Sequence, residues 1–124
     1  HRMNLSDGIL IKDNHIAAAG GVGEAIKMVK KNLAKKMKIE VECDNLTQVQ
    51  EAVNAGADII MLDNMNITQI KKAILIINKK SQIEISGGVT LKNLNSLSKL
   101  NINYISIGAL THSFDAADIG LDVL

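Results

Sequence analysis

The chain has 124 residues, of which 47% are hydrophobic and 22% charged, with 14 basic and 13 acidic side chains. This length fits one domain, the composition excludes a disordered chain, and the hydrophobic runs are too short to cross a bilayer. A net charge of +1 with one Phe, one Tyr and no Trp also argues against nucleic-acid binding, which needs basic and stacking side chains. We expect a globular domain that binds neither nucleic acid nor membrane.

The single cysteine, Cys43, excludes an internal disulfide and fits a reducing compartment, so we expect a cytoplasmic protein. The opening residues do not have the basic-then-hydrophobic pattern of a secretory leader. The start His1-Arg2-Met3 is unusual for a translated sequence. We therefore expect the chain to be a fragment of a longer protein.

Five short hydrophobic runs predict β-strands at residues 9–12, 39–43, 58–63, 83–86 and 104–108. After the first strand, a hydrophobic stripe from Val22 to Met37 predicts a helix, and the glycine-rich residues 20–23 predict a flexible loop before it. Polar N-cap residues, two of them followed by glutamine three positions later, predict the starts of three more helices: Asn45, Asn66 and Thr90. Gly56 is predicted to end the helix that begins after Asn45.

The last residues of the four later strands, Glu42, Asp63, Ser86 and Gly108, are 21, 23 and 22 positions apart. A strand–helix step of this length builds a parallel sheet, either open and doubly wound or closed into a barrel. A complete eight-unit barrel needs roughly 200 residues or more. We expect an α/β fold of repeated βα units, with residues 1–124 as a single domain that forms most of a TIM-like (open) barrel lacking its N-terminal strands.

Polar side chains gather at the predicted strand ends, where parallel barrels keep their chemistry. Lys12 ends a hydrophobic strand, so it should point into the barrel and need a carboxylate partner. Glu40 and Glu42 share one face of the next strand, and one of them should neutralise Lys12. Each strand-end carboxylate is alternatively a simple helix cap, but polar ends on five consecutive strands favour a site.

The residue types at these ends also indicate possible ligands. The three histidines and Cys43 lack the spacing of a zinc site, whereas Glu42 and Asp63 suit magnesium, completed by waters and phosphates. The glycine-rich ends 86–88 and 108–109 would let backbone N–H groups bind a phosphate. The alternative is that these glycines only permit tight turns. Residues 20–23 lack the lysine and hydroxyl of a nucleoside-triphosphate loop.

Two longer motifs are more specific, Lys12-Asp13-Asn14-His15 and Gly108-Ala109-Leu110-Thr111-His112-Ser113. They occur in order with six further segments, at residues 1–7, 18–21, 40–42, 55–58, 60–64 and 86–88. In this order and spacing, the segments resemble the quinolinate phosphoribosyltransferase family, the carboxylating nicotinate-nucleotide pyrophosphorylases. The resemblance covers nearly the whole chain.

The resemblance implies an enzyme, a pentosyltransferase of NAD biosynthesis. It would join quinolinate to phosphoribosyl pyrophosphate, giving nicotinate mononucleotide, pyrophosphate and CO2, with Mg²⁺ and no organic cofactor. The implied catalytic residues are Lys12, Glu42 and Asp63, of which the two carboxylates hold Mg²⁺ or ribose hydroxyls and stabilise the cationic ribose carbon.

The resemblance also implies substrate-binding residues. For the quinolinate carboxylates these are His1, Arg2 and Lys12. Phosphate would meet the backbone of a second set: Ser86, Gly87, Gly88, Ile107, Gly108 and Ala109. His112 is either a pyrophosphate ligand or a histidine that anchors a loop.

Family members carry a separate N-terminal domain, the first barrel strands and further basic residues, and a partner subunit completes each active site. These parts are absent from the sequence. The resemblance implies that the parent enzyme is a homodimer. We expect the fragment alone to be inactive and to aggregate or self-associate through its sheet edges.

Three other readings remain open. The first is a related phosphoribosyltransferase-like protein, such as the molybdenum-transport homologue, with another acceptor. The second is a non-catalytic structural fragment. The third is a phosphate-binding barrel of thiazole or tryptophan biosynthesis, which would explain the glycines but not the cations His1, Arg2 and Lys12.

Overall fold

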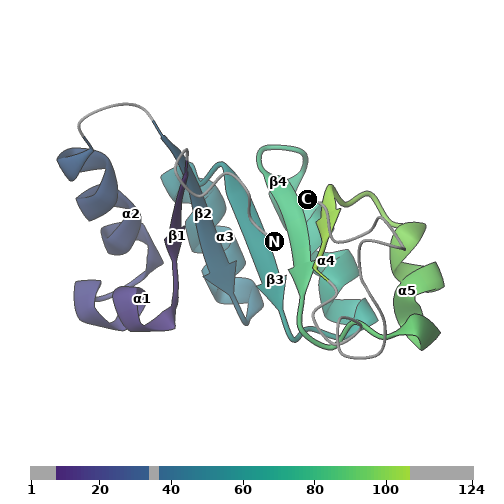
Figure 1. Ribbon diagram of the computed structural model, residues 1–124. Helices are drawn as coiled ribbons and strands as arrows, with labels where there is room; N and C mark the ends of the chain where they lie inside the picture. Colours follow the sequence, from purple (N-terminus) through teal and green to yellow (C-terminus); the bar gives the residue numbers. More distant parts are fainter. Residues whose placement is uncertain (1–7, 34–36, 107–124) are drawn as a thin grey trace.

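In the computed structural model, which describes residues 8–33 and 37–106, strands and helices alternate along the chain (Figure 1). The strands are β1 (Gly8–Ile11), β2 (Lys38–Cys43), β3 (Ile59–Asp63), β4 (Gln82–Ser86) and β5 (Tyr104–Ile105). The helices are α1 (Asp13–Ala19), α2 (Val22–Asn32), α3 (Leu46–Ala55), α4 (Ile67–Ile77) and α5 (Leu91–Ser98). None of these helices is long and hydrophobic enough to cross a bilayer.

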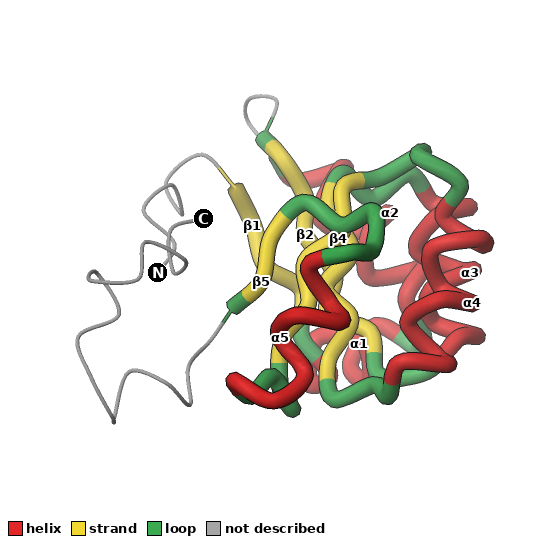
Figure 2. Tube along the Cα trace, turned by 90° about the vertical axis from the view of Figure 1, so that its right-hand side faces the viewer, coloured by secondary structure: helices red, strands yellow, loops and turns green. Residues whose placement is uncertain are grey.

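The strands form one parallel sheet in the order β1-β2-β3-β4-β5, so each strand pairs with its neighbours in sequence. Right-handed connections between strands in this order place the helices on one face of the sheet. Figure 2 shows α2, α3 and α4 together on one side of the strands. A doubly wound sheet reverses its strand order, and the described strands do not. The predicted repeat of βα units, wound as in a barrel, is confirmed.

One face of the sheet and the inward sides of the helices form the hydrophobic core. The strands supply alternate β-branched and leucine side chains, which suit a pleated buried surface. The helices contribute residues at helical spacing, such as Val49 and Ala52 on α3 and Ile70 and Ala73 on α4. The core side chains of the strands are Ile11, Ile39, Val41, Cys43, Ile60, Leu62, Ile83 and Ile85.

The alternate residues of the strands face away from this core and include most of the sheet's carboxylates. Glu42 is in register with Met61, which is in register with Glu84, and Asp63 is in register with Ser86. Glu40 and Glu84 are buried, with exposed fractions of 4% and 5%. The sheet therefore separates a hydrophobic face from one that carries charge.

The predicted helix caps are confirmed. Asn45, Asn66 and Thr90 each accept a hydrogen bond from the backbone N–H three residues later. Gly56 ends α3 in the left-handed conformation, with φ +83°. Such caps satisfy the free N–H and C=O groups at helix ends.

The predicted helix from Val22 to Met37 is too long. Helix α2 ends at Asn32, whose Nδ2 donates to the carbonyl of Met28 at 2.8 Å, and Leu33 is extended. An asparagine that bonds to its own helix backbone weakens the continuation of that helix. At the other end of this helix, the predicted loop 20–23 is shorter than expected, because α2 begins at Val22 and includes Gly23.

Helix α1 was not predicted, and several strand bounds shift by one residue. Strands β1, β2 and β4 begin one residue earlier than predicted, at Gly8, Lys38 and Gln82. The first strand ends at Ile11, not at Lys12, because Lys12 is the N-cap of α1. The third strand begins at Ile59, not at residue 58. The last strand ends at Ile105, so Ser106 does not belong to it as predicted, and residues 107–108 of the prediction lie outside the described part.

Candidate active site

The C-terminal ends of β1 to β4 bring four of the predicted site residues to one edge of the sheet: Lys12, Glu42, Asp63 and Ser86. Because the strands are parallel and in sequential order, these residues follow one another across the edge. Gly87 and Gly88 continue from Ser86. The remaining predicted residues, His1, Arg2, Ile107, Gly108, Ala109 and His112, lie outside the described residues.

Both carboxylates at this edge, Glu42 and Asp63, have raised pKa values. Partial burial raises the pKa of Glu42, the negative charges of Asp63 and Asp13 raise it further, and the Lys12 ammonium opposes them. Partial burial also raises the pKa of Asp63, with Asp13 and Asp44 adding to the shift. A positive charge arriving among these groups would be stabilised.

Lys12 is exposed, and it lies directly after β1, not in the strand as predicted. The chain turns into α1 directly after Ile11, which places Lys12 at the rim of the sheet. Its charge lowers the pKa of Glu42 on β2. The start of α1 fixes its backbone, because the Lys12 carbonyl accepts from the N–H groups of His15 and Ile16 at 2.9 and 3.0 Å.

Asp13 and Asp44 belong to the electrostatics of this edge and were not predicted as site residues. Asp13 raises the pKa of both Glu42 and Asp63, and Asp44 does the same from the residue after β2. The motif of residues 12–15 is recognisable in the sequence, but Asp13 was not assigned a role. Helix α1, which was not predicted, begins at Asp13 and brings it near these carboxylates.

The loop after β4 packs closely against the end of β3. Gly87 and Gly88 have φ +72° and +71°, which favour glycine. A Cβ atom on Gly87 would lie 2.8 Å from Oδ1 of Asp63 and 3.1 Å from the Asn64 nitrogen. The N–H of Asn64 donates to the Ser86 carbonyl at 2.9 Å. Gly87 is therefore required for the Asp63 carboxylate to sit where it does.

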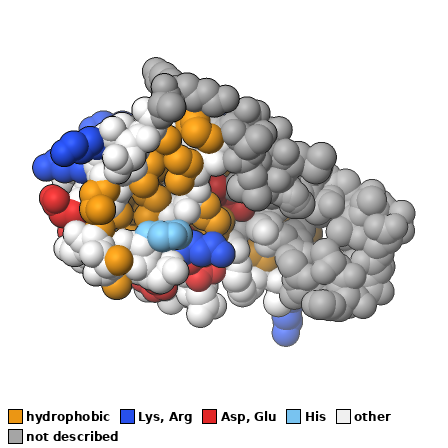
Figure 3. All heavy atoms as spheres, turned by 60° about the vertical axis from the view of Figure 1, so that its left-hand side comes forward, with side chains coloured by type: hydrophobic (Ala, Val, Ile, Leu, Met, Phe, Trp, Pro, Cys, Tyr) orange, Lys and Arg blue, Asp and Glu red, His pale blue; other side chains and the backbone are white. Residues whose placement is uncertain are grey.

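Charged side chains are visible on the exterior near α1 and β1. Figure 3 shows basic, acidic and histidine side chains close together on this face, beside a patch of hydrophobic side chains. Within the described residues, no group of three or more His, Cys, Asp or Glu side chains could hold a metal ion. Two carboxylates remain a sufficient protein contribution for Mg²⁺, which commonly keeps waters and substrate phosphates as its other ligands.

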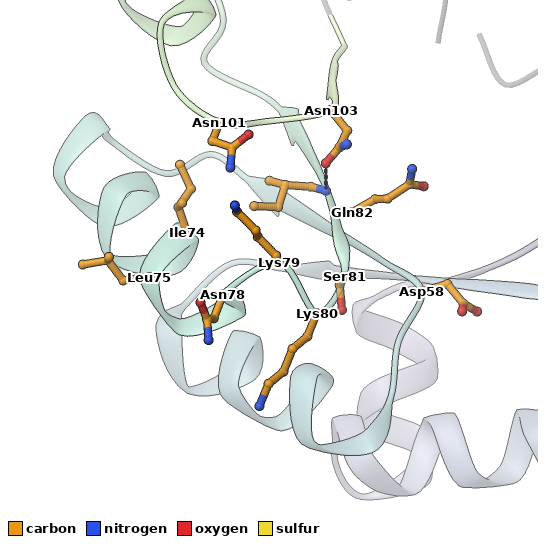
Figure 4. Close-up of a pocket in the computed structure, with 11 residues that line it drawn as sticks. Asp58, Ile74, Leu75, Asn78, Lys79, Lys80, Ser81, Gln82, Asn101 and Asn103 are labelled. Carbon is orange, nitrogen blue, oxygen red and sulfur yellow. Dashed lines mark hydrogen bonds between the residues drawn. The ribbon is translucent and has the colours of Figure 1, made fainter.

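A cavity of about 580 Å³ lies at the opposite, N-terminal end of β3 and β4 (Figure 4). Several of its polar groups already bond to the backbone. Ser81 Oγ donates to the Ala57 carbonyl at 2.7 Å, and Asn103 Oδ1 accepts from the Ile83 N–H at 2.8 Å. Asp58 Oδ2 accepts from the Ile39 N–H at 2.8 Å. This end of the sheet therefore serves stability, as it does in parallel barrels generally.

Comparison with known proteins adds independent information about the chain. Residues 1–122 match the family model "Quinolinate phosphoribosyl transferase, C-terminal domain". The chain is 47% identical to the probable carboxylating nicotinate-nucleotide pyrophosphorylase of Methanocaldococcus jannaschii, covering 100% of the chain and 46% of that protein. It is 40% identical to the chloroplastic enzyme of that name from Arabidopsis thaliana, over 99% of the chain and 40% of that protein.

A solved structure gives the same result. The crystal structure of nicotinate-nucleotide pyrophosphorylase from Ehrlichia chaffeensis superimposes with a TM-score of 0.83 at 49% identity, over 92% of this chain and 41% of that one. The chain thus spans less than half the length of these relatives.

Proposed function

The chain belongs to the quinolinate phosphoribosyltransferase family, whose C-terminal domain it matches, and we propose that the complete protein transfers a phosphoribosyl group to quinolinate. Phosphoribosyl pyrophosphate is the donor, and the products are nicotinate mononucleotide, pyrophosphate and CO2. The names of the relatives support this reaction. The observation that carries it here is the juxtaposition of one cation, two electrostatically coupled carboxylates and a glycine loop at the ends of consecutive strands.

Lys12 acts on the acceptor side in this proposal. Quinolinate is a dianion, and an exposed ammonium whose backbone is fixed by α1 can bind a carboxylate by a charge-assisted hydrogen bond. The predicted partners of Lys12 in this role are His1 and Arg2. The Lys12 ammonium also lowers the pKa of Glu42, against the burial and the negative charges that raise it.

Glu42 and Asp63 act at the ribose. When the pyridine nitrogen bonds to the ribose carbon and the bond from that carbon to pyrophosphate breaks, positive charge develops on the ribose. The carboxylates are held together at an electrostatic cost, and this developing charge relieves the cost. Their interaction is therefore stronger in the transition state than in the substrate complex.

Glu42 and Asp63 would also hold Mg²⁺, which would neutralise the charge of the departing pyrophosphate. The backbone of residues 86–88 would bind a phosphate group through its N–H groups. Gly87 and Gly88 have positive φ values and carry no side chain that could obstruct the phosphate. Residues 107–109 and His112 are the predicted partners of this loop. No organic cofactor enters the reaction.

We also propose a cytoplasmic homodimer. The thiol of Cys43 is buried, and its pKa is raised to about 12, mainly by desolvation. Such a thiol suits a structural cysteine in a reducing compartment. Sedimentation of the complete protein would give its oligomeric state.

The reaction can be tested with the complete protein, quinolinate labelled in the carboxyl group lost in the reaction, and phosphoribosyl pyrophosphate. We expect release of labelled CO2 and formation of nicotinate mononucleotide in equal amounts, both dependent on Mg²⁺. Nicotinate replacing quinolinate provides the control, because it has no second carboxylate to lose. If neither product forms, or if nicotinate is the better acceptor, the proposed reaction is wrong.

A further inference from the structure

The side chain of His15 bonds to the backbone of Lys12. Its Nδ1 accepts a hydrogen bond from the Lys12 N–H at 3.1 Å, while the His15 N–H donates to the Lys12 carbonyl at 2.9 Å. Both backbone polar groups of Lys12 are therefore engaged by the first turn of α1. These contacts set the direction in which the Lys12 side chain leaves the rim of the sheet.

Helices α4 and α5 have the same device with different side chains, and in α3 the corresponding bond goes to the residue before the N-cap. On α4, Gln69 Oε1 accepts from the N–H of the N-cap Asn66 at 3.0 Å, and on α5, Asn93 Oδ1 accepts from Thr90 at 2.8 Å. On α3, Gln48 Oε1 accepts from the Asp44 N–H at 2.9 Å. An amide oxygen accepts at any ordinary pH, but an imidazole nitrogen accepts only while it carries no proton.

We propose that His15 is a positioning residue for Lys12, and that quinolinate binding requires the neutral imidazole of His15. This inference rests on the proposed function, in which Lys12 binds a quinolinate carboxylate. Protonation would turn Nδ1 into a donor, so that the Lys12 N–H loses its acceptor. It would also place a positive charge at the N-terminal end of a helix, which the helix dipole disfavours.

Charged groups of both signs surround the start of α1. Asp13 on the helix and Glu42, Asp44 and Asp63 at the strand ends are the acidic groups of this edge. Lys12 is the basic group beside them. On α2, which packs against α1, Glu24 and Lys27 largely cancel, since they lie 3.8 Å apart.

The test is calorimetric binding of quinolinate and of phosphoribosyl pyrophosphate to the complete protein, between about pH 8 and pH 5.5, across the histidine range. At the upper pH, His15→Ala should weaken quinolinate binding about tenfold, a loss within the range of a helix-start hydrogen bond. Binding of phosphoribosyl pyrophosphate should stay unchanged. His15→Gln should restore quinolinate affinity, because glutamine supplies the acceptor at this position.

The pH profile separates positioning from a general structural role. As the pH falls, wild-type affinity for quinolinate should decrease relative to that of His15→Gln, by up to the same factor of about ten. The matched control is Gln69→His, which moves the titratable acceptor to α4 and should leave the wild-type quinolinate profile unchanged. Normal affinity in His15→Ala, or parallel profiles for wild type and His15→Gln, would overturn the inference.

Amide hydrogen exchange at Lys12 reports on positioning without any substrate. Exchange should accelerate in His15→Ala and return to the wild-type rate in His15→Gln. If this pattern appears but the wild-type protein does not bind quinolinate, the proposed function fails while the positioning role stands. If quinolinate binds and Lys12 exchange is the same in all three proteins, the positioning role is wrong.

Discussion

Near the N-terminal ends of β2 and β4, polar side chains complete the hydrogen bonds of the backbone, whereas at the C-terminal ends they repel one another. Asp58 and Asn103 accept from strand N–H groups at 2.8 Å. Glu42 and Asp63, by contrast, have raised pKa values because of burial and neighbouring carboxylates. Carboxylates occur at both ends of the sheet. The hydrogen bond of Asp58 lowers the free energy of the folded state, whereas the charges of Glu42 and Asp63 raise it.

This difference indicates which end has been shaped by chemistry. A fold that needed only stability would not place like charges together at half-buried positions. The cost at the C-terminal end is understandable if a cation, or a carbon that becomes cationic, binds there. Substitutions at the two ends should therefore have opposite consequences for stability and activity, and the following changes test that expectation.

The largest effect is expected from Asp63→Asn. The substitution keeps the shape and removes the charge, so turnover should fall by about 10²–10³-fold, as for other preorganised electrostatic groups. Substrate affinity should change much less, because the positive charge grows only towards the transition state. Steady-state kinetics of the complete protein give both values. A normal kcat with a raised KM would place Asp63 in ground-state binding instead.

Lys12→Ala should act on one substrate. A charged hydrogen bond to a carboxylate contributes about 1.5–3 kcal/mol, so quinolinate affinity should fall roughly ten- to a hundredfold. Affinity for phosphoribosyl pyrophosphate should stay close to wild type. Equal losses for the two substrates would show that Lys12 is not specific to the acceptor.

Asp58→Ala probes the opposite end of the sheet. It removes the acceptor of the Ile39 N–H, and an unsatisfied buried donor costs about 1–3 kcal/mol in the free energy of unfolding. Denaturant unfolding measures this loss, while turnover should remain at the wild-type level. Asp58→Asn keeps an oxygen acceptor and should lose less; equal losses would contradict the hydrogen-bond explanation.

Gly87→Ala and Gly88→Ala form a matched pair at the C-terminal end. Both residues have positive φ, so the backbone cost of alanine is similar, about 1 kcal/mol. A Cβ at residue 87 would meet Asp63 Oδ1 at 2.8 Å, whereas one at residue 88 would have Asn64 Oδ1 at 3.6 Å, an ordinary contact. Gly87→Ala should therefore be the less stable variant in denaturant unfolding, and similar stabilities would show that the loop moves freely away from Asp63.

The smallest effect is a gain in stability for Glu42→Gln. The pKa of Glu42 is raised in the folded state, so its contribution to stability is present below the ordinary pKa of glutamate and is lost as the pH rises through the folded pKa. At neutral pH the uncharged variant should be more stable, by less than about 1 kcal/mol at this partly exposed position. Thermal unfolding across this pH window should show the two proteins converging in acid. A variant less stable than wild type at neutral pH would contradict the electrostatic cost.

The order of the elements and most helix starts were predictable from local signals. Capping residues such as Asn66 act through bonds to residues three positions away, and strand ends at regular spacing follow from a repeated unit. Glu42 and Asp63 could be placed together because parallel strands end at the same edge of a sheet. These features depend on short-range chemistry and on simple topology.

Helix α1 and its consequences could not be predicted in the same way. The helix has seven residues, its buried residue is Ile16, and its N-cap is a lysine, so neither hydrophobic spacing nor residue preference indicates it. Without α1, Lys12 was assigned to the end of the first strand, and Asp13 and His15 had no role. These assignments depend on where the chain turns after β1, which tertiary packing determines.

The sequential strand order also determines how this domain can assemble. Strands β1 to β5 pair with their immediate successors, and the helix contacts α1–α2, α2–α3 and α3–α4 follow the same order. Structure can therefore form first in the middle, around β2, β3 and β4, and extend outward one βα unit at a time, with short loops to close at each step. Damage near β3 should interrupt this growth on both sides, whereas damage near β1 should leave the remaining units able to fold.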